Sequence, residues 1–432
     1  GAGRLMSSQS RIPPRPAGEP AGMSPQPATA SGHRALPVWL LLFAVIMLGA
    51  SLRAPIVVVG PVVGPIRDSL GLSASLMGFV TALPLMAFAF CSPWASRLAR
   101  RFGMERVLIA AHLVLIIGLG VRAGFASTPT LILGTALMSA AIAMSNVLLP
   151  ALAKRNLPDR IGLVVGCMTT AMLISSGIAS AIAVPLADWQ GWPLPLAVWV
   201  LPAGLAMLGW WRVSRYPHPD GGQPQAGTGA TPNVWRIPAA WTISLFMGIQ
   251  SLIFYALAAF MPSVLAEKGI SAAGAGSLGA LLQIVSLLGV VAVSFVPARG
   301  RARQTLALTV ALMTLLGVLG IWLGGAGSMW LWISLIGAGT AGIFSLCLVL
   351  FAARTEHSAE AAAVSGMAQA VGYSVAVLGP LGVGVLYEWV GSWTHTMPLL
   401  VALGVIECLI AWSAASPVTL GQTLKARAAA GS

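Results

Sequence analysis

The sequence predicts an all-α membrane protein with twelve transmembrane helices in two halves of six, and three observations support this prediction. Of the 432 residues, 57% are hydrophobic and only 8% are charged, whereas soluble chains carry about 25% charged residues. Twelve apolar runs are long enough to cross a bilayer, and one polar segment divides them into two equal sets. A soluble fold could not bury this much apolar surface, so a lipid bilayer is the expected partner of the chain.

The apolar runs define the expected helices. A helix that rises about 1.5 Å per residue needs about 20 residues to cross about 30 Å of hydrocarbon. Backbone groups find no water there, so runs of this length must be helical. In chain order, the expected helices occupy about residues 37–66, 74–96, 107–124, 130–152, 162–186, 193–213, 238–262, 274–296, 305–324, 329–351, 361–386 and 393–414.

Polar segments outside these runs define the expected domains. Residues 1–35, rich in Pro, Ser, Gly and Arg, are expected to form a disordered N-terminal tail. Residues 36–213 and 237–414 form the two expected six-helix bundles, which are equal in length. Between them, residues 214–236 contain the breaker-rich YPHPDGGQPQAGTGATPN and predict a flexible cytoplasmic linker. Residues 415–432 are expected to form a cytoplasmic tail.

The net charge of +13 is explained by membrane orientation rather than by nucleic-acid binding. Lys and Arg form short clusters between the apolar runs, without the basic stripe of a nucleic-acid-binding surface. If the N-terminus is cytoplasmic, 20 of the 24 Lys and Arg residues fall on the cytoplasmic side, as the positive-inside rule requires. Arg67, Lys268 and, near a helix end, Arg122 fall on the far side. We therefore predict a multi-pass protein of the bacterial inner membrane with both termini cytoplasmic.

No residue pattern predicts an enzyme, a cofactor or a metal site. Cys91, Cys167, Cys347 and Cys408 all lie in apolar runs, without CxxC spacing or a suitably placed His. The chain contains no Walker loop, nucleophile elbow or Gly-rich dinucleotide turn. We expect a monomer that handles a small-molecule substrate without chemical conversion.

Arg53 is the strongest functional signal, because it is the one charge left inside the membrane near the middle of the first expected helix. A charge at this depth costs about 2.5–3.5 kcal/mol on insertion scales. Pro55 follows closely, and a proline frees backbone carbonyls nearby. We interpret Arg53 as the binding residue for an anionic substrate in a central cavity. The alternative is a structural Arg bonded to the carbonyls of neighbouring helices.

Uncharged polar residues within the expected helices are candidates for the same cavity. Donors of this kind around one fixed cation suit a small planar or linear anion. The alternative for each is a hydrogen bond between helices, worth about 0.6 kcal/mol on average. The candidates are Gln250, Tyr255, Gln283, Gln369 and Tyr373.

Three further polar residues lie within the runs. For Asn146 we favour a structural role. His112 can relay protons in principle, although a packing role is favoured, and Glu407 is a second candidate for proton coupling as the one carboxylate deep in a run. Since the central charge is an Arg and not an acid, uniport, exchange and symport in which the anion carries the proton all remain open.

The basic turn RLARRFGMERV after the second run resembles the signature turn of the major facilitator superfamily. Arg100 stands at the position of the family's Asp, Arg101 at its Arg and Gly103 at its Gly, with Arg106 among the basic residues that follow. The resemblance implies the major facilitator fold, alternating access between two bundles, and a gating role for this turn.

Four stretches resemble the cyanate and 2-nitroimidazole transporter family within that superfamily. They are SLRAPIVVVGPVVGPIRDSLGLS, SNVLLPALAKRNLPDR, IQSLIFYALAAFMPSVLAEKGISAAGAGSL and MAQAVGYSVAVLGPLGVGVLYEWVGSW. The resemblance implies a secondary or facilitative transporter of a small inorganic, organic or heteroaromatic anion. An exporter of nitroimidazole-like or other small drugs is the nearest alternative, and a transporter-like sensor without transport is a remote one.

Overall fold

The computed structural model describes residues 36–216, 233–296 and 300–422, which are nearly all helical and contain no strand. Twelve helical spans are long and apolar enough to cross a membrane, so the predicted fold class is confirmed. The predicted N-terminal tail, most of the predicted linker and residues 423–432 lie outside the described residues.

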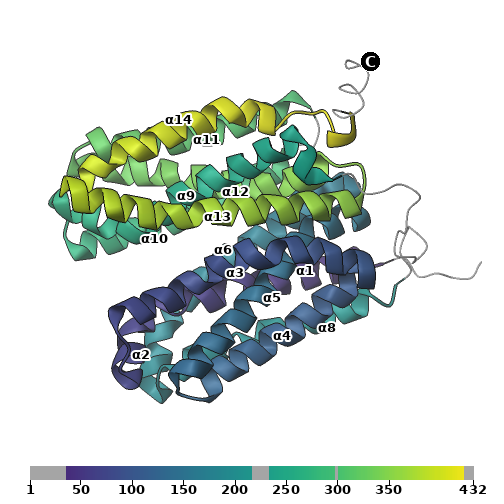
Figure 1. Cartoon of the computed structure of the whole chain (residues 1–432), viewed down its shortest axis with the longest axis horizontal. Coiled ribbons are helices and arrows are strands. Elements are labelled where there is room, and N and C mark those ends of the chain that lie inside the picture. Colours follow the sequence, from purple (N-terminus) through teal and green to yellow (C-terminus); the bar gives the residue numbers. More distant parts are fainter. Residues whose placement is uncertain (1–35, 217–232, 297–299, 423–432) are drawn as a thin grey trace, which may run out of the picture. The chain divides into compact units, whose positions relative to one another are not determined.

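The N-terminal half contains six of the spans (Figure 1). Its elements are α1 (Val38–Val57), α2 (Val63–Leu70), α3 (Ala74–Phe102), α4 (Met104–Gly124), α5 (Thr128–Asn156), α6 (Ile161–Gln190), α7 (Pro193–Ala197) and α8 (Val200–Val213).

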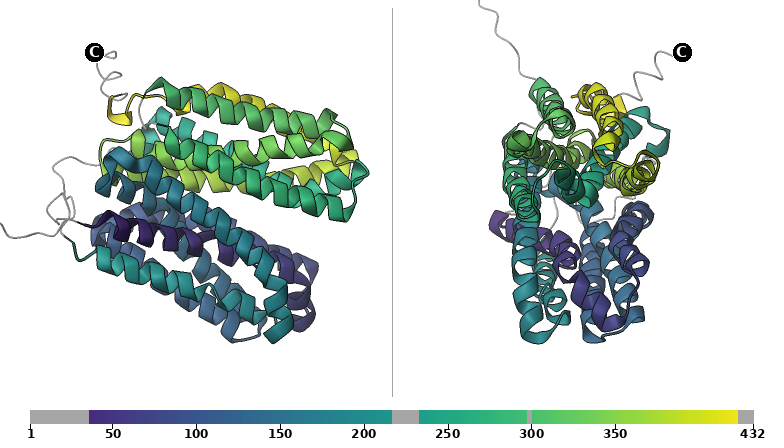
Figure 2. Two further views of the ribbon diagram at one scale, coloured as in Figure 1. Left: turned by 180° about the vertical axis from the view of Figure 1, so that it is seen from behind. Right: turned by 90° about the vertical axis from the view of Figure 1, so that its left-hand side faces the viewer.

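The C-terminal half contains the other six spans, coloured from teal to yellow beside the purple and blue N-terminal half (Figures 1 and 2). Its elements are α9 (Pro238–Glu267), α10 (Ala272–Phe295), α11 (Arg301–Leu323), α12 (Met329–Ala353), α13 (Ser358–Val390) and α14 (Met397–Ala414).

Two of the expected helices are interrupted. The first span is divided into α1 and α2 by a short 3₁₀ turn at Gly60–Val62, where Pro61 cannot donate to the carbonyl of Val57. The sixth span is divided into α7 and α8 between residues 197 and 200, and Pro202 likewise leaves the Val198 carbonyl without its helical donor. Arg53 consequently lies in the last turns of α1, although it is near the middle of the whole span.

Most other helices extend beyond the expected runs by several residues. The third helix along the chain, α3, continues to Phe102 and ends at Gly103, which has a φ of 89°. Its last turn carries Arg100 and Arg101, whose positive charges are favourable at a helix C-terminus. Polar ends of this kind continue the helical hydrogen bonding outside the hydrocarbon, where hydropathy alone does not detect them.

Glycines allow helices within each half to approach closely. In the N-terminal half, a Cβ at Gly134 would lie 2.5 Å from the backbone nitrogen of Arg122. In the C-terminal half, a Cβ at Gly289 would lie 2.2 Å from the carbonyl oxygen of Ala338. These positions tie α4 to α5 and α10 to α12 at distances that no larger residue permits.

We call the end of the molecule where α1 begins, α8 ends and α9 begins the linker end. Toward this end, hydrogen bonds join the two halves. Lys154 Nζ, at the end of α5, donates to the carbonyl oxygens of Ala352 (2.8 Å) and Thr355 at the end of α12. Farther in, the hydroxyls of Thr169 and Ser345 lie 3.4 Å apart.

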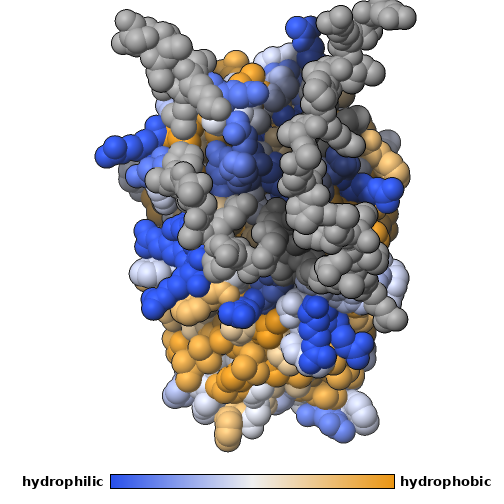
Figure 3. All heavy atoms as spheres, turned by 90° about the vertical axis from the view of Figure 1, so that its right-hand side faces the viewer, coloured by the Kyte–Doolittle hydropathy of each residue, from blue (hydrophilic) through white to orange (hydrophobic). Residues whose placement is uncertain are grey.

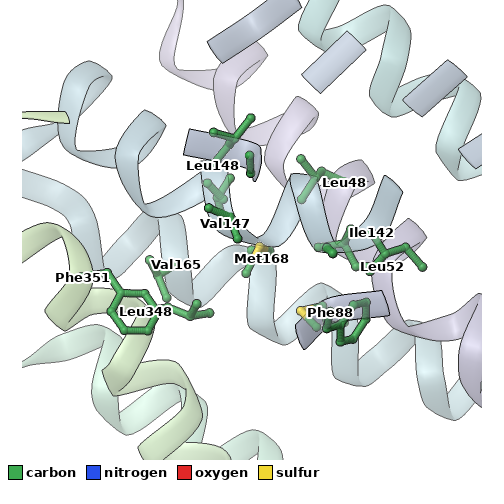
Figure 4. Packing of buried hydrophobic residues seen from close by; sticks show 14 of the residues in the cluster. Leu48, Leu52, Phe88, Ile142, Val147, Leu148, Val165, Met168, Leu348 and Phe351 are labelled. Atoms are coloured by element: carbon green, nitrogen blue, oxygen red, sulfur yellow. The ribbon is translucent and has the colours of Figure 1, made fainter. Parts of the chain in front are cut away.

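Apolar packing also crosses between the halves near this end. Figure 4 shows Leu348 and Phe351 of α12 beside Val165 of α6, within one cluster of buried residues. A Cβ at Gly366 of α13 would lie 2.9 Å from the carbonyl oxygen of Ser92 of α3. The halves therefore meet there without room for larger side chains.

Hydrophilic side chains gather at the linker end (Figure 3). Two buried arginines at the same end anchor the described start of the C-terminal tail. Arg303 donates to the carbonyls of Ala415 and Ser416, and Arg354 donates to those of Ser413, Ala414 and Val418. Both arginines thus cap the C-terminal end of α14, where cations are stabilised.

Candidate functional site

A cavity of about 300 Å³ lies between the two halves. Its walls come from four helices of the N-terminal half, α1, α3, α5 and α6, and four of the C-terminal half, α9, α10, α12 and α13. The lining is mainly apolar and aromatic, with a few polar side chains, as is typical of small-molecule sites.

Five of the six predicted substrate-binding residues line this cavity. They are Arg53, Gln250, Tyr255, Gln283 and Tyr373, and they come from both halves although up to 320 positions separate them in the sequence. The sixth, Gln369, lies outside the lining: it is buried, and its Nε2 donates to Ser365 Oγ at 3.0 Å. Gln369 lies one turn before Tyr373 on the same face of α13, yet only Tyr373 lines the cavity.

Arg53 brings the positive charge to the cavity. Its guanidinium carbon lies 5.2 Å from the centre of the Phe254 ring, within the range of a cation–π contact. It also lies within electrostatic reach of the Tyr255 and Tyr373 hydroxyls. Within the described residues Arg53 has no carboxylate partner and no hydrogen bond, so its donors are available to an anion.

The end of α1 is held by a second buried arginine. Arg122 of α4 is fully buried, and its Nη1 donates to the carbonyl oxygen of Pro55 at 2.9 Å. We expected Arg122 near a helix end on the far side of the membrane, and it lies in the last turn of α4. Its side chain does not face outward, because the close approach of Gly118 and Gly134 seats α4 against α5. Arg53 is therefore not the one charge within the core, and Arg122 fixes the backbone two residues beyond it.

Asn146 is a cavity residue that the sequence interpretation placed among structural residues. It lines the cavity from α5, is 2% exposed, and forms no side-chain hydrogen bond within the described part of the chain. Its Oδ1 has less than 1 Å² of exposed surface and no partner, whereas the amide nitrogen is not sealed in this way. Asn146 therefore brings an amide without a side-chain hydrogen bond to the cavity wall.

The remaining polar lining residues are satisfied within the protein. Thr169 donates to Val165 at 2.9 Å, Ser286 donates to Gly337 at 3.1 Å, and Ser251 donates to Gln250 Oε1 at 3.1 Å. Among the lining residues, the side chains without a hydrogen bond to the described residues are Arg53, Asn146, Tyr255, Gln283 and Tyr373. Gln250 accepts one bond, but its Nε2 donates none within the same described residues.

The two candidates for proton coupling lie away from the cavity. His112 is fully buried in α4, where Nδ1 lies 2.8 Å from the Leu108 carbonyl oxygen and Nε2 has no partner. Glu407 is fully buried in α14, and neither of its carboxyl oxygens has a partner in the described residues. Neither side chain is placed to touch a substrate in the cavity.

The basic turn between α3 and α4 lies at the linker end. Arg100, Arg101 and Arg106 are exposed there, and Gly103 makes the turn with a positive φ that favours glycine. The adjacent Glu105 pairs with Arg155 at the end of α5. The ion pair thus ties the start of α4 to the end of α5 within one half. None of these residues lines the cavity.

Metal binding has no structural support in the described part of the chain, where no group of three or more His, Cys, Asp and Glu side chains could hold an ion. The four cysteines are free thiols.

Comparisons with known proteins agree with one another over most of the chain. The family model of the Major Facilitator Superfamily matches residues 39–380. The uncharacterized transporter YycB of Bacillus subtilis is 36% identical over 85% of this chain and 91% of its own length. The 2-nitroimidazole transporter of Escherichia coli is 34% identical over 86% and 93%. The cyanate transport protein CynX of Escherichia coli is 28% identical over 82% and 91%.

Solved structures resemble this chain in fold. The proton:xylose symporter XylE, bound to 6-bromo-6-deoxy-D-glucose, has a TM-score of 0.73 and 16% identity, and the match covers 90% of this chain and 98% of that one. At this identity the likeness concerns the arrangement of helices and not the ligand.

Proposed function

The chain belongs to the Major Facilitator Superfamily, and we propose that, as one of its transporters, it carries a small anion across the bacterial inner membrane with Arg53 as the binding residue. The observation that carries this proposal is that one cation and several polar side chains without a hydrogen bond to the described residues line the same cavity between the halves. Buried polar groups are normally paired, because leaving one unsatisfied costs about 1–3 kcal/mol. An anion would satisfy Arg53 and accept hydrogen bonds from its neighbours.

The contacts between the halves support alternating access. Lys154 and the close packing at Gly366 hold the halves together toward the linker end, while the cavity lies deeper, between α1 and α9. We take residues 36–213 and 237–414 as the two moving units and 214–236 as the segment that connects them. Breaking the contacts at the linker end would open the cavity to that side.

The distribution of charge supports the orientation. Arg100 and Arg101 end α3, and Lys154 and Arg155 end α5, all at the linker end. The opposite end carries few cations, and Lys268 is one of them. We therefore place the linker end in the cytoplasm, with both termini on that side.

A binding experiment tests the role of Arg53. Purified wild-type protein, Arg53→Ala and Arg97→Ala are screened by thermal shift against small anions, cyanate among them. Arg97 is the matched control, since its guanidinium lies 5.1 Å from the Trp94 ring but is exposed outside the cavity. A charge-assisted bond contributes about 1.5–3 kcal/mol, so Arg53→Ala should weaken binding about 10- to 100-fold while Arg97→Ala binds normally. Equal stabilisation of all three proteins by the same anion would refute the role of Arg53.

Export of a neutral drug is the second candidate function, favoured by the 34% identity to the 2-nitroimidazole transporter and by the aromatic lining of the cavity. The two candidates differ in their dependence on charge. Anion transport in liposomes should carry current and require Arg53, whereas transport of a neutral nitroimidazole should be electrically silent unless an ion is coupled to it.

A further inference from the structure

We infer that the substrate is an aromatic monoanion, a single planar ring that carries one acidic group, rather than a triatomic inorganic anion. The inference rests on the proposed role of Arg53 and narrows the substrate class for the same site. Three independent features of the cavity carry it: its volume, the rings in its walls and the number of charges that it holds.

The volume is too large for a triatomic anion. A cavity of about 300 Å³ has the size of a small-molecule site, for which about 300–1,000 Å³ is typical, whereas one water takes up about 30 Å³ of the liquid. A linear triatomic anion on Arg53 would leave most of this space to water, against walls that are mainly apolar. A ring with one acidic substituent fills it and removes apolar surface from water, which contributes about 25 cal/mol per Å².

The rings in the walls provide faces and edges for an aromatic ligand. Phe88, Phe254, Tyr255, Phe344 and Tyr373 line the cavity from four helices that belong to both halves. Phe88 and Tyr373 meet across the two halves with centroids 4.8 Å apart and planes tilted by 57°. Such tilted and edge-to-face pairs contribute about 0.5–1.5 kcal/mol beyond area burial, and a substrate ring would extend the same packing.

The position of Arg53 connects the charge to the rings. Because its guanidinium lies 5.2 Å from the centre of the Phe254 ring, a carboxylate bound to Arg53 would bring its own ring to the same aromatic wall. Among the lining residues Arg53 is the one cation, and no carboxylate faces it. One cation matches one negative charge, and a second carboxylate on the ligand would be buried without a partner.

The test is a ligand series measured by isothermal titration calorimetry on the purified full chain. The probes are benzoate, its saturated analogue cyclohexanecarboxylate, its neutral analogue benzamide, the dianion terephthalate, and cyanate. We expect benzoate to bind most tightly, cyclohexanecarboxylate about 5- to 10-fold more weakly, and terephthalate, benzamide and cyanate at least 10-fold more weakly.

Two variants test the aromatic wall. Phe254→Leu should reduce the preference for benzoate over cyclohexanecarboxylate to about 2-fold or less. Phe90→Leu is the matched control, because Phe90 is 73% exposed on the outside of α3, and it should retain the wild-type preference. The ligand series on the wild-type protein decides the question even where a variant does not fold.

The outcomes separate the inference from the function that it rests on. The aromatic substrate class is refuted if cyanate or cyclohexanecarboxylate binds as tightly as benzoate. It is also refuted if no monocarboxylate binds. If binding of the preferred anion still disappears in Arg53→Ala, the proposed function survives that result. If benzamide binds as well as benzoate and Arg53→Ala has no effect, the anion-binding function itself is refuted.

Discussion

Replacing Asn146 with leucine should make the protein more stable and a worse binder at the same time. The side chain is 2% exposed, and its Oδ1 has no hydrogen-bond partner and less than 1 Å² of exposed surface. An unsatisfied buried acceptor costs about 1–3 kcal/mol. Leucine has nearly the same shape without the polar atoms, so Asn146→Leu should raise the free energy of unfolding by about that amount.

The same substitution removes a donor from the cavity. The loss of one hydrogen bond to a charged ligand group, about 1.5–3 kcal/mol, corresponds to anion binding roughly 10- to 150-fold weaker. The assays are thermal unfolding without ligand and calorimetric titration with benzoate, on protein in the same detergent.

A substitution farther along the same helix is the control. Asn156 ends α5, and its Nδ2 donates to the Leu152 carbonyl at 3.0 Å, so Asn156→Leu removes a bond that is made and should neither stabilise the protein nor change binding. A less stable Asn146→Leu protein with unchanged affinity would show that Asn146 is a satisfied structural residue, and the argument from its missing partner would fail.

Two further predictions concern the residues that hold the site and the halves in place. Arg122→Met should leave thermal stability nearly unchanged, because it removes a buried charge together with its bond. It should weaken benzoate binding several-fold, because the Pro55 carbonyl loses the donor that fixes the end of α1. Loss of folding with unchanged affinity in the remaining protein would contradict this prediction. Lys154→Met should speed hydrogen–deuterium exchange at the ends of α5 and α12, since two charge-assisted bonds to Ala352 and Thr355 disappear. The control is Arg160→Met, because Arg160 is exposed at the same end. Identical exchange in both variants would show that the contact does not hold the halves together.

The fold followed from the sequence because its signal is physical and long-range. Twelve runs must be helical in lipid, and the long polar segment at residues 214–236 divides them into two sets of six, which leaves little choice of architecture. The breaks within spans were less visible: Pro61 and Pro202 lie inside apolar runs, and hydropathy treats an interrupted span like a continuous one.

The site was only partly predictable, since a polar residue within a helix can face a cavity or a neighbouring helix. Arg53 was identified because a charged side chain near the bilayer centre has a high free-energy cost, which a functional role would explain. Gln369 and Asn146 look alike in sequence, yet the first is bonded one turn away to Ser365 and the second lines the cavity unbonded. The rotation of each helix decides between these cases, and it depends on packing against helices that are distant in the sequence.

The contact made by Lys154 has a consequence for how this protein could use an ion gradient. Its bonds to Ala352 and Thr355 end on backbone carbonyls, which take up no proton in the physiological range. Nearby, burial lowers the pKa of Arg354 only to about 10, and its bonds to the end of α14 persist from about pH 5 to pH 8. These bonds of Lys154 and Arg354 therefore keep their donors and acceptors across that pH range, and a proton gradient does not itself break them.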